Sequence, residues 1–313
     1  MIEQFKKDVD AGLSASPKHL SSKYFYDDIG SQIFQKIMAM PEYYLTDSEF
    51  EILSLQAKQI AEKLNFNGSF NIIELGAGDG YKTIKLLKKF IELGLEFTYI
   101  PVDISKKAID ILLEKVAQEI PKLKVKPFVG DYFKLLSTMP NDISSLVLFL
   151  GSNIGNFKSQ DAQLFLKSIQ NHLKPNDKLL IGFDLQKNPV TIKNAYDDPH
   201  GITKAFNMNL LHRINHELDA DFRLDKFDFY CHYNPTNGEV SSYLVSLKQQ
   251  DVYIKALDKT YSFDYNELIW TELSKKYSFT EIENLCTTSK FELTHNFLDC
   301  KHYFVDSLWN CIQ

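Results

Sequence analysis

The sequence has few cysteines, no long apolar run and no block of basic residues. Its four cysteines (Cys231, Cys286, Cys300 and Cys311) are far apart and form no C-x-x-C pair. They therefore predict reduced thiols in a cytoplasmic protein, and argue against a disulfide framework or a zinc site. No run of about 18 apolar residues predicts a membrane-spanning helix. Residues 1–8 lack the apolar core of a signal peptide.

The charge balance excludes another group of partners. Acidic residues outnumber basic ones by 41 to 35, which gives a net charge of −6. Without a basic cluster, nucleic acid is a poor partner, and without an apolar span no membrane partner is expected, so we expect a small-molecule ligand. A length of 313 residues predicts one large domain or two interlocked domains. No obvious dimer surface is evident, so we expect a monomer.

Glycine is also scarce, with 13 in the chain, yet three fall within five positions at Gly76, Gly78 and Gly80. This loop follows residues 71–75, in which Ile72, Ile73 and Leu75 predict a buried strand, and precedes a predicted helix over residues 83–93. Because glycine has no Cβ atom, a ligand can lie against the loop. A strand, a glycine loop and a helix in this order bind nucleotides at the carboxyl edge of an α/β sheet.

Two ligands compete for such a loop, a dinucleotide and S-adenosylmethionine. The dinucleotide fingerprint G-x-G-x-x-G needs its third glycine one residue later than Gly80. Glu74 and Asp79 flank the loop, where carboxylates would repel a pyrophosphate. S-adenosylmethionine has no phosphate and carries a sulfonium cation, so the loop favours it. A nicotinamide-dependent oxidoreductase stays the alternative, supported by the generic loop alone.

Two further acids follow the next predicted strands. Asp103 ends the run 99–103, where it can accept both ribose hydroxyls. Asp131 follows the run 125–129, where it can accept from the adenine amino group while its neighbour Tyr132 covers the ring. Three acids in order at strand ends predict a methyltransferase sheet.

The remaining pattern predicts an α/β, Rossmann-like, doubly wound sheet. Strands and helices alternate from 71 to 185, with Ser105 as the N-cap of a helix through Ile120 and buried strands at 145–150 and 178–185. Residues 291–299 and 302–309 predict a final antiparallel pair. Before the sheet, Ser48 to Asn65 predicts one helix. Thr280 with Glu283 fits a capping box.

An inserted α+β segment interrupts this alternation over residues 187–275. It contains a predicted helix at 201–218 and predicted antiparallel strands at 227–233, 240–247 and 252–257. We therefore expect a cofactor-binding domain from 56–186 plus 276–313, and a substrate-binding domain from 1–55 plus 187–275. His212 and His216 have metal-ligand spacing on the helix, but Arg213 replaces the glutamate of H-E-x-x-H and no third ligand is evident, so no metal site is expected.

Taken together, the chain resembles the histidine-specific, S-adenosylmethionine-dependent methyltransferases that make hercynine for ergothioneine biosynthesis. The resemblance covers roughly residues 16 to 309. Its matching segments are 23–27, 41–44, 74–76, 101–105, 151–156, 195–198, 205–209 and 271–274.

The resemblance implies an enzyme that adds up to three methyl groups to the α-amine of histidine. It implies that Tyr43, Asn156 and Tyr196, with Tyr26 nearby, hold the amino-acid group and act in catalysis, and that Glu272 and Ser274 grip the imidazole. Its implied cofactor residues are Gly76, Gly78, Lys82, Asp103 and Asp131, to which the reasoning above adds Tyr132.

One departure leaves the acceptor open. Ser242 falls where relatives carry a methionine near the imidazole. A smaller, polar residue would change the shape of the side-chain pocket, so another amino acid or amine is the alternative substrate. A non-catalytic binding protein is a further alternative, which the retained Tyr43, Asn156, Tyr196 and Glu272 disfavour.

Overall fold

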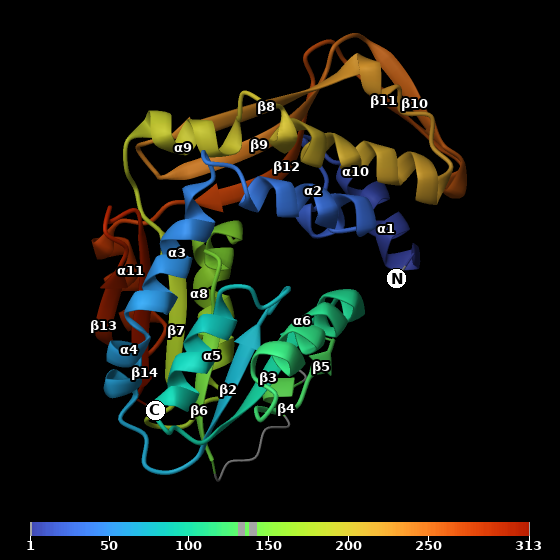
Figure 1. Ribbon diagram of the computed structural model, residues 1–313. Coiled ribbons are helices and arrows are strands. Elements are labelled where there is room, and N and C mark those ends of the chain that lie inside the picture. The colour runs from blue at the N-terminus through green and yellow to red at the C-terminus, as the bar shows by residue number, and fades with distance from the viewer. Residues whose placement is uncertain (1, 131–134, 138–142, 313) are drawn as a thin grey trace. The chain divides into compact units, whose positions relative to one another are not determined.

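A computed structural model describes residues 2–130, 135–137 and 143–312 (Figure 1). The chain divides into two compact units. Unit 1 consists of residues 1–44 and 187–274, and unit 2 of residues 45–186 and 275–313. Each unit is built from two segments, so the chain passes from one unit to the other three times.

Unit 2 contains a sheet that has eight strands among the described residues. Their order is β13-β14-β7-β6-β2-β3-β4. The short strand β5 also pairs with β3, nearer the carboxyl end of β3 than β4 does. The strands are β2 (Phe70–Leu75), β3 (Phe97–Asp103), β4 (Lys124–Val125), β5 (Phe128–Val129), β6 (Ser144–Phe149), β7 (Lys178–Asp184), β13 (Phe291–Leu298) and β14 (Phe304–Cys311).

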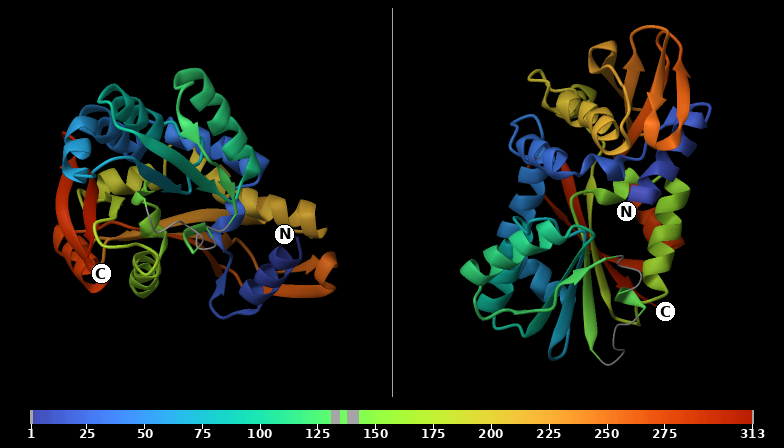
Figure 2. Two further views of the ribbon diagram at one scale, coloured as in Figure 1. Left: turned by 90° about the horizontal axis from the view of Figure 1, so that it is seen from below. Right: turned by 90° about the vertical axis from the view of Figure 1, so that its right-hand side faces the viewer.

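The direction of these strands confirms the predicted fold class. Strands β2 to β7 are parallel, whereas β14 is antiparallel to both β7 and β13. The chain winds from β2 to β3 in one direction and from β6 to β7 in the other, so right-handed crossovers place their helices on opposite faces. Accordingly α5 (Thr83–Glu92) and α6 (Lys106–Glu119) lie on one face and α8 (Ser159–Gln170) on the other (Figure 2). Because both faces are covered, β2 and β7 are buried throughout.

The helix predicted over 48–65 is two helices, so that prediction is wrong in its extent. Helix α3 (Tyr44–Leu55) and helix α4 (Ala57–Leu64) are separated at Gln56, whose side chain donates to the Leu298 carbonyl at 2.7 Å. Glu51 of α3 accepts from the Cys300 N–H at 2.8 Å. These contacts tie α3 to the end of β13, which explains why unit 2 begins at residue 45 and not at residue 56.

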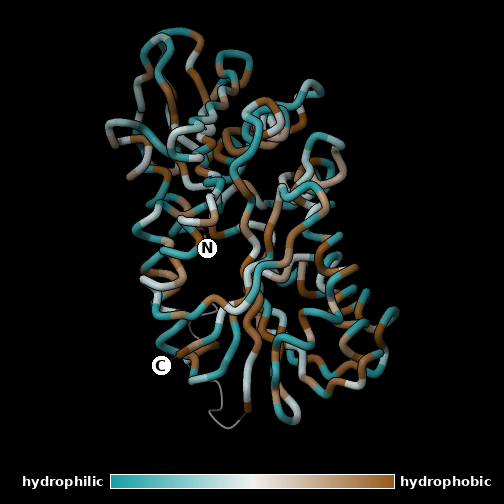
Figure 3. Tube along the Cα trace, turned by 90° about the vertical axis from the view of Figure 1, so that its left-hand side faces the viewer, coloured by the Kyte–Doolittle hydropathy of each residue, from teal (hydrophilic) through white to brown (hydrophobic). Residues whose placement is uncertain are grey.

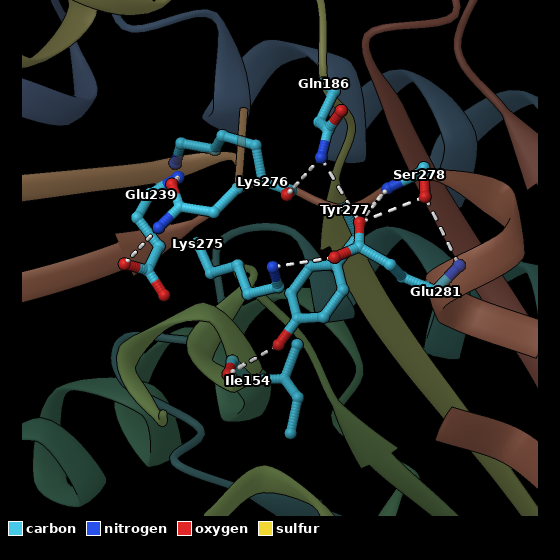
Figure 4. A network of polar contacts seen from close by, with 9 residues as sticks. Ile154, Gln186, Glu239, Lys275, Lys276, Tyr277, Ser278 and Glu281 are labelled. Carbon is cyan, nitrogen blue, oxygen red and sulfur yellow. Dashed lines mark hydrogen bonds and ion pairs between the residues drawn. The ribbon is translucent and has the colours of Figure 1, made fainter. Parts of the chain in front are cut away.

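The segment after Ser274 returns the chain to the sheet of unit 2 (Figure 4). The Tyr277 N–H donates to the Asp184 carbonyl at 2.8 Å, and the Tyr277 hydroxyl donates to the Ile154 carbonyl at 3.3 Å. Helix α11 (Phe279–Thr288) follows directly. Its capping box is formed by Ser278 and Glu281. The predicted box of Thr280 and Glu283 is therefore wrong by two residues.

Unit 1 combines helices with a small sheet. The sheet order is β1 (Lys18–His19), β12 (Leu268–Lys275), β9 (Glu239–Ser246) and β8 (Phe227–Asn234). Its α-helices are α1 (Ile2–Ser14), α2 (Asp28–Met38), α9 (Pro189–Tyr196) and α10 (Ile202–Leu218), with 3-10 turns η1 (Ser22–Phe25), η3 (Leu224–Lys226) and η4 (Lys255–Leu257). Hydrophobic and hydrophilic stretches alternate along the helices (Figure 3), as one buried face requires.

The inserted segment confirms one predicted strand pair and corrects the next. β8 and β9 are antiparallel, and the predicted helix at 201–218 is α10. The strand predicted at 252–257 does not join them. It is β10 (Gln250–Ile254), which pairs with β11 (Lys259–Phe263) as a separate two-stranded sheet. Neither β11 nor β12 was predicted.

Candidate active site

The glycine loop of unit 2 follows β2, at the carboxyl edge of the sheet. Gly78 has φ of +55°, which favours glycine, and a Cβ atom there would meet nothing within 4 Å. A Cβ at Gly80 would lie 3.1 Å from the Leu112 side chain of α6. Gly80 therefore serves packing, whereas the backbone at Gly78 is open on that side and offers space for a ligand.

Asp103 is tied to this loop. It ends β3, and its carboxylate accepts from the Gly78 N–H at 3.1 Å and from the Ser105 N–H at 2.8 Å. Each carboxylate oxygen keeps a further lone pair, so Asp103 can still accept from the ribose hydroxyls of a nucleoside. The Ser105 N-cap is confirmed, because its side chain accepts from the Ala108 N–H.

Glu74 does not face the ligand side of the loop. Its side chain is buried, and its carboxylate accepts from the hydroxyls of Thr83 and Tyr99. Desolvation raises the pKa of Glu74 to about 7. Asp79, the other flanking acid, pairs with Lys115 at 2.6 Å. The expectation that Glu74 would repel a pyrophosphate is therefore wrong, and the choice of ligand has to come from the rest of the site.

Lys82 stands immediately before α5. Its ammonium pairs with Glu49 of α3, and 21% of the Lys82 side chain is exposed while Glu49 is fully buried. The second oxygen of Glu49 accepts from the Gly151 N–H at 2.6 Å. A partly exposed ammonium, an acceptor carboxylate at Asp103 and the open backbone at Gly78 suit a ligand with a carboxylate and a ribose, as S-adenosylmethionine has. Asp131 and Tyr132 lie outside the described residues.

The substrate residues predicted in residues 1–44 and 187–274 come together within unit 1. The hydroxyl of Tyr196, at the end of α9, lies 2.9 Å from the Ser274 hydroxyl of β12. The ring of Tyr43 lies 6.1 Å from that of Tyr196 in an edge-on arrangement. Phe34 of α2 continues the aromatic series, with centroid distances of 6.4 Å to Tyr43 and 5.4 Å to Tyr26.

Glu272 belongs to the same group. It lies two residues before Ser274 on β12, so both side chains point to one face of the strand. Desolvation and then the negative charge of Glu272 raise the pKa of the Tyr26 hydroxyl. Ser242 is buried on β9, the strand beside β12. Hydroxyl groups and one carboxylate thus gather in a setting of aromatic rings.

Asn156 belongs to unit 2, whereas the other five predicted substrate residues belong to unit 1: Tyr26, Tyr43, Tyr196, Glu272 and Ser274. It is the last residue of the 3-10 turn η2 (Asn153–Asn156), after β6, and its side chain is exposed. A Cβ at Gly155 would lie 2.7 Å from the Lys275 carbonyl. The close approach of the segment 275–277 therefore fixes the turn that presents Asn156.

Two acids near the carboxyl edge of the sheet, Glu49 and Asp306, were not predicted as site residues from the sequence. The sequence gives no sign that Glu49 belongs to the site, because Glu49 is one of several polar residues on its helix. Asp306 gives a faint one, because it is the one charged residue of the strand β14, in which it is fully buried. His212 and His216 are exposed on α10, and no group of metal-ligating side chains occurs in the described ranges. None of the described helices is long and apolar enough to cross a membrane.

Comparison with known proteins places the chain in a family. The model of the histidine-specific, S-adenosylmethionine-dependent methyltransferases matches residues 5–311. Histidine N-alpha-methyltransferase of Mycolicibacterium smegmatis is 36% identical over 88% of this chain and 85% of that protein. Ergothioneine biosynthesis protein 1 of Schizosaccharomyces pombe is 31% identical over 89% of this chain and 37% of that protein.

Solved structures resemble the chain more distantly. An S-adenosylmethionine-dependent methyltransferase from Clostridium acetobutylicum is 14% identical and matches with a TM-score of 0.47, over 84% of this chain and 92% of that one. The family match and the relatives extend over both units and nearly the whole sequence. The chain belongs to the histidine-specific, S-adenosylmethionine-dependent methyltransferases.

Proposed function

We propose that the protein transfers methyl groups from S-adenosylmethionine to the α-amine of L-histidine, giving up to Nα,Nα,Nα-trimethylhistidine, or hercynine. The names of its relatives support this reaction. The observation that carries it for this chain is the group formed by Tyr43, Tyr196, Ser274 and Glu272, four side chains from distant parts of the sequence that gather in unit 1.

The hydroxyl groups suit the reacting amine. An α-amine attacks only when neutral, and a neighbouring carboxylate would stabilise its ammonium form. Tyr43, Tyr196 and Asn156 offer uncharged hydrogen-bonding groups. We propose that they hold the amino-acid end of the substrate and keep the amine free of an acidic partner. Positioning and exclusion of water then supply most of the acceleration.

Glu272 and Ser274 suit the other end of histidine. An imidazole offers an N–H donor and a nitrogen acceptor, which a carboxylate and a hydroxyl can bind together. A carboxylate left without a donor disfavours an apolar side chain, so the pair confers selectivity as well as affinity.

The proposed cofactor-binding residues all lie in unit 2. S-adenosylmethionine, when bound, supplies the activated methyl group. Lys82 would hold its carboxylate, Asp103 its ribose hydroxyls, and the backbone at Gly76 and Gly78 would lie against it. Asp131 and Tyr132 stay proposed adenine contacts. In this proposal unit 2 binds the cofactor and unit 1 supplies most substrate contacts. Each protein group orients a ligand through non-covalent contacts, and no covalent bond forms between the protein and a ligand.

Calorimetric titration of histidine into the protein loaded with S-adenosylhomocysteine tests the proposal. Glu272→Ala should weaken histidine binding by about tenfold or more, because it removes a hydrogen bond to a charged group. Glu283→Ala, which removes an exposed glutamate from α11, should leave binding unchanged. Equal histidine affinity in wild type and Glu272→Ala would contradict the imidazole contact.

Ser242 keeps one alternative acceptor open, because a smaller residue beside β12 could admit a different side chain. A panel of amino acids assayed for methyl uptake separates the two. Preference for a substrate without an imidazole would overturn histidine as the acceptor. We also propose that the chain acts as a monomer, for which light scattering should return the 36.2 kDa of one chain.

A further inference from the structure

A cluster of ionisable groups, of which the two acids are fully buried and the lysine is partly exposed, lies beside the two loops that follow β2 and β6. It consists of Glu49 from α3, Lys82 before α5 and Asp306 from β14, and is named here the acid–lysine cluster. One oxygen of Glu49 pairs with the Lys82 ammonium, and the other accepts from the Gly151 N–H at 2.6 Å. A single buried carboxylate therefore holds both loops at the carboxyl edge of the sheet.

The sheet is shaped to accept this carboxylate. Gly182 of β7 lies directly opposite Asp306 on β14. A Cβ atom at Gly182 would overlap Glu49 Oε1 and lie 3.0 Å from the Phe304 ring. The missing side chain thus leaves the space that the Glu49 carboxylate fills. A fully buried carboxylate is costly unless it is paired and hydrogen-bonded, so this arrangement is not ordinary core packing.

Asp306 is the third member of the cluster. It is fully buried, and its oxygens accept from no N–H or O–H group in the described part of the chain. Desolvation, followed by the negative charge of Glu49, raises the pKa of Asp306 well above its ordinary value. A protonated Asp306 carboxyl can donate a hydrogen bond to the Glu49 carboxylate, the group whose negative charge acts on it. Lys82 and Glu49 supply one charge of each sign, so the cluster is balanced.

We propose that Glu49, braced by Asp306, is a positioning residue of the cofactor site that fixes the Lys82 ammonium where it meets the carboxylate of S-adenosylmethionine. The inference rests on the proposed function, because it needs that cofactor. A lysine ammonium has three donors, so the pair with Glu49 leaves donors for the ligand. The carboxylate is the only anionic group of S-adenosylmethionine, and a fixed cation orients the amino-acid arm next to the reacting methyl group.

The first test compares two ligands. S-adenosylhomocysteine carries the carboxylate, whereas 5′-methylthioadenosine keeps the adenosine and lacks the amino-acid arm. Glu49→Gln should weaken S-adenosylhomocysteine binding about tenfold, the lower end for one hydrogen bond to a charged group, and change 5′-methylthioadenosine binding less than about twofold. The matched control is Glu51→Gln on the same helix, which should change neither. An equal loss for both ligands would mean that the loops are merely disordered, and would overturn the inference.

A double-mutant cycle tests whether Glu49 acts through Lys82. The variant Glu49→Gln/Lys82→Met should bind S-adenosylhomocysteine within about twofold of Lys82→Met alone. Additive losses would contradict a role through the lysine. Asp306→Asn keeps a donor toward Glu49 and should retain wild-type affinity, whereas a loss as large as that of Glu49→Gln would contradict the neutral acid.

The two proposals fail in different ways. A wild-type protein that binds no S-adenosylhomocysteine would overturn the proposed function, and this inference with it. A wild-type protein that binds it, with unchanged affinity in Glu49→Gln, would overturn the positioning role alone.

Discussion

At the scale of single residues, Glu74 shows how a carboxyl can serve the fold where the sequence places it beside a ligand. It follows Ile72 and Ile73 of β2 and lies just before the glycine loop, which is why a role toward the ligand was expected. Both faces of β2 are covered, however, so a strand-end acid can also point inward. There the hydroxyls of Thr83 and Tyr99 donate hydrogen bonds to its carboxylate. Sequence periodicity does not distinguish two buried faces.

The raised pKa of Glu74 predicts a pH-dependent stability. Its ordinary value of 4.5 rises to about 7 in the folded protein. Between these values the folded state keeps a proton that the unfolded state releases, so stability falls as the pH rises through this window. From about pH 5 to about pH 7.5, wild type should lose about 2 kcal/mol more than Glu74→Gln. Urea unfolding at several pH values measures this difference.

A surface variant controls for the other titrating groups. Glu62 of α4 has 62% of its side chain exposed, so Glu62→Gln should follow the wild-type curve. Parallel stability curves for wild type and Glu74→Gln would show that Glu74 is ionised in the folded protein throughout this pH range.

At the scale of elements, the beginning of α11 shows what a local motif can and cannot decide. Two overlapping capping boxes fit the sequence, Ser278 with Glu281 and Thr280 with Glu283. The first one forms because Tyr277 is held to the sheet through the Asp184 carbonyl, which leaves Ser278 as the first residue able to cap. That tether comes from a residue about ninety positions away, so the sequence motif alone cannot choose between the boxes.

Removing the two candidate caps should therefore have unequal effects. Ser278→Ala should destabilise unit 2 by about 1 kcal/mol, because the Glu281 N–H loses its acceptor. This corresponds to a fall in Tm of about 2 °C for a chain of this size. Thr280→Ala lies inside the first turn and should change stability by less than about 0.5 kcal/mol. A larger loss for Thr280→Ala in thermal unfolding would reverse the assignment.

Other elements divide in the same way between local and distant causes. Some strands were predictable, because their apolar runs and the antiparallel pairing depend only on residues close together in the sequence. These are the strands at 145–150 and 178–185 and the final pair. The break at Gln56 was not, because it depends on the Leu298 carbonyl. Strand β12 was not predicted, and one of its two partners, β1, comes from the other segment of unit 1. The grouping of Glu272 and Ser274 with Tyr196 depends on that same long-range pairing, and came from family resemblance alone.

At the scale of the whole molecule, the two units have separate hydrophobic cores. One core joins the sheet of unit 2 with α8 and α11, through residues such as Val147, Leu166 and Ile282. The other joins α1, α2 and α10 with the small sheet of unit 1, through residues such as Phe25, Leu210 and Ile269. Neither core draws a buried residue from the other unit.

Separate cores predict that unit 2 can fold without unit 1. The two ends of the long insertion meet within unit 2, where the Gln186 N–H donates to the Tyr277 carbonyl at 2.9 Å. A linker of about six glycine and serine residues can therefore replace residues 187–274 in a shortened chain that begins at residue 45. This chain should unfold cooperatively and bind S-adenosylhomocysteine within about tenfold of the full protein, because the proposed cofactor residues all lie in unit 2. It should not bind histidine, because Tyr43, Tyr196, Glu272 and Ser274 are removed. Calorimetry with both ligands measures each half of this prediction. A shortened chain that folds but binds no S-adenosylhomocysteine would mean that unit 1 contributes directly to the cofactor site.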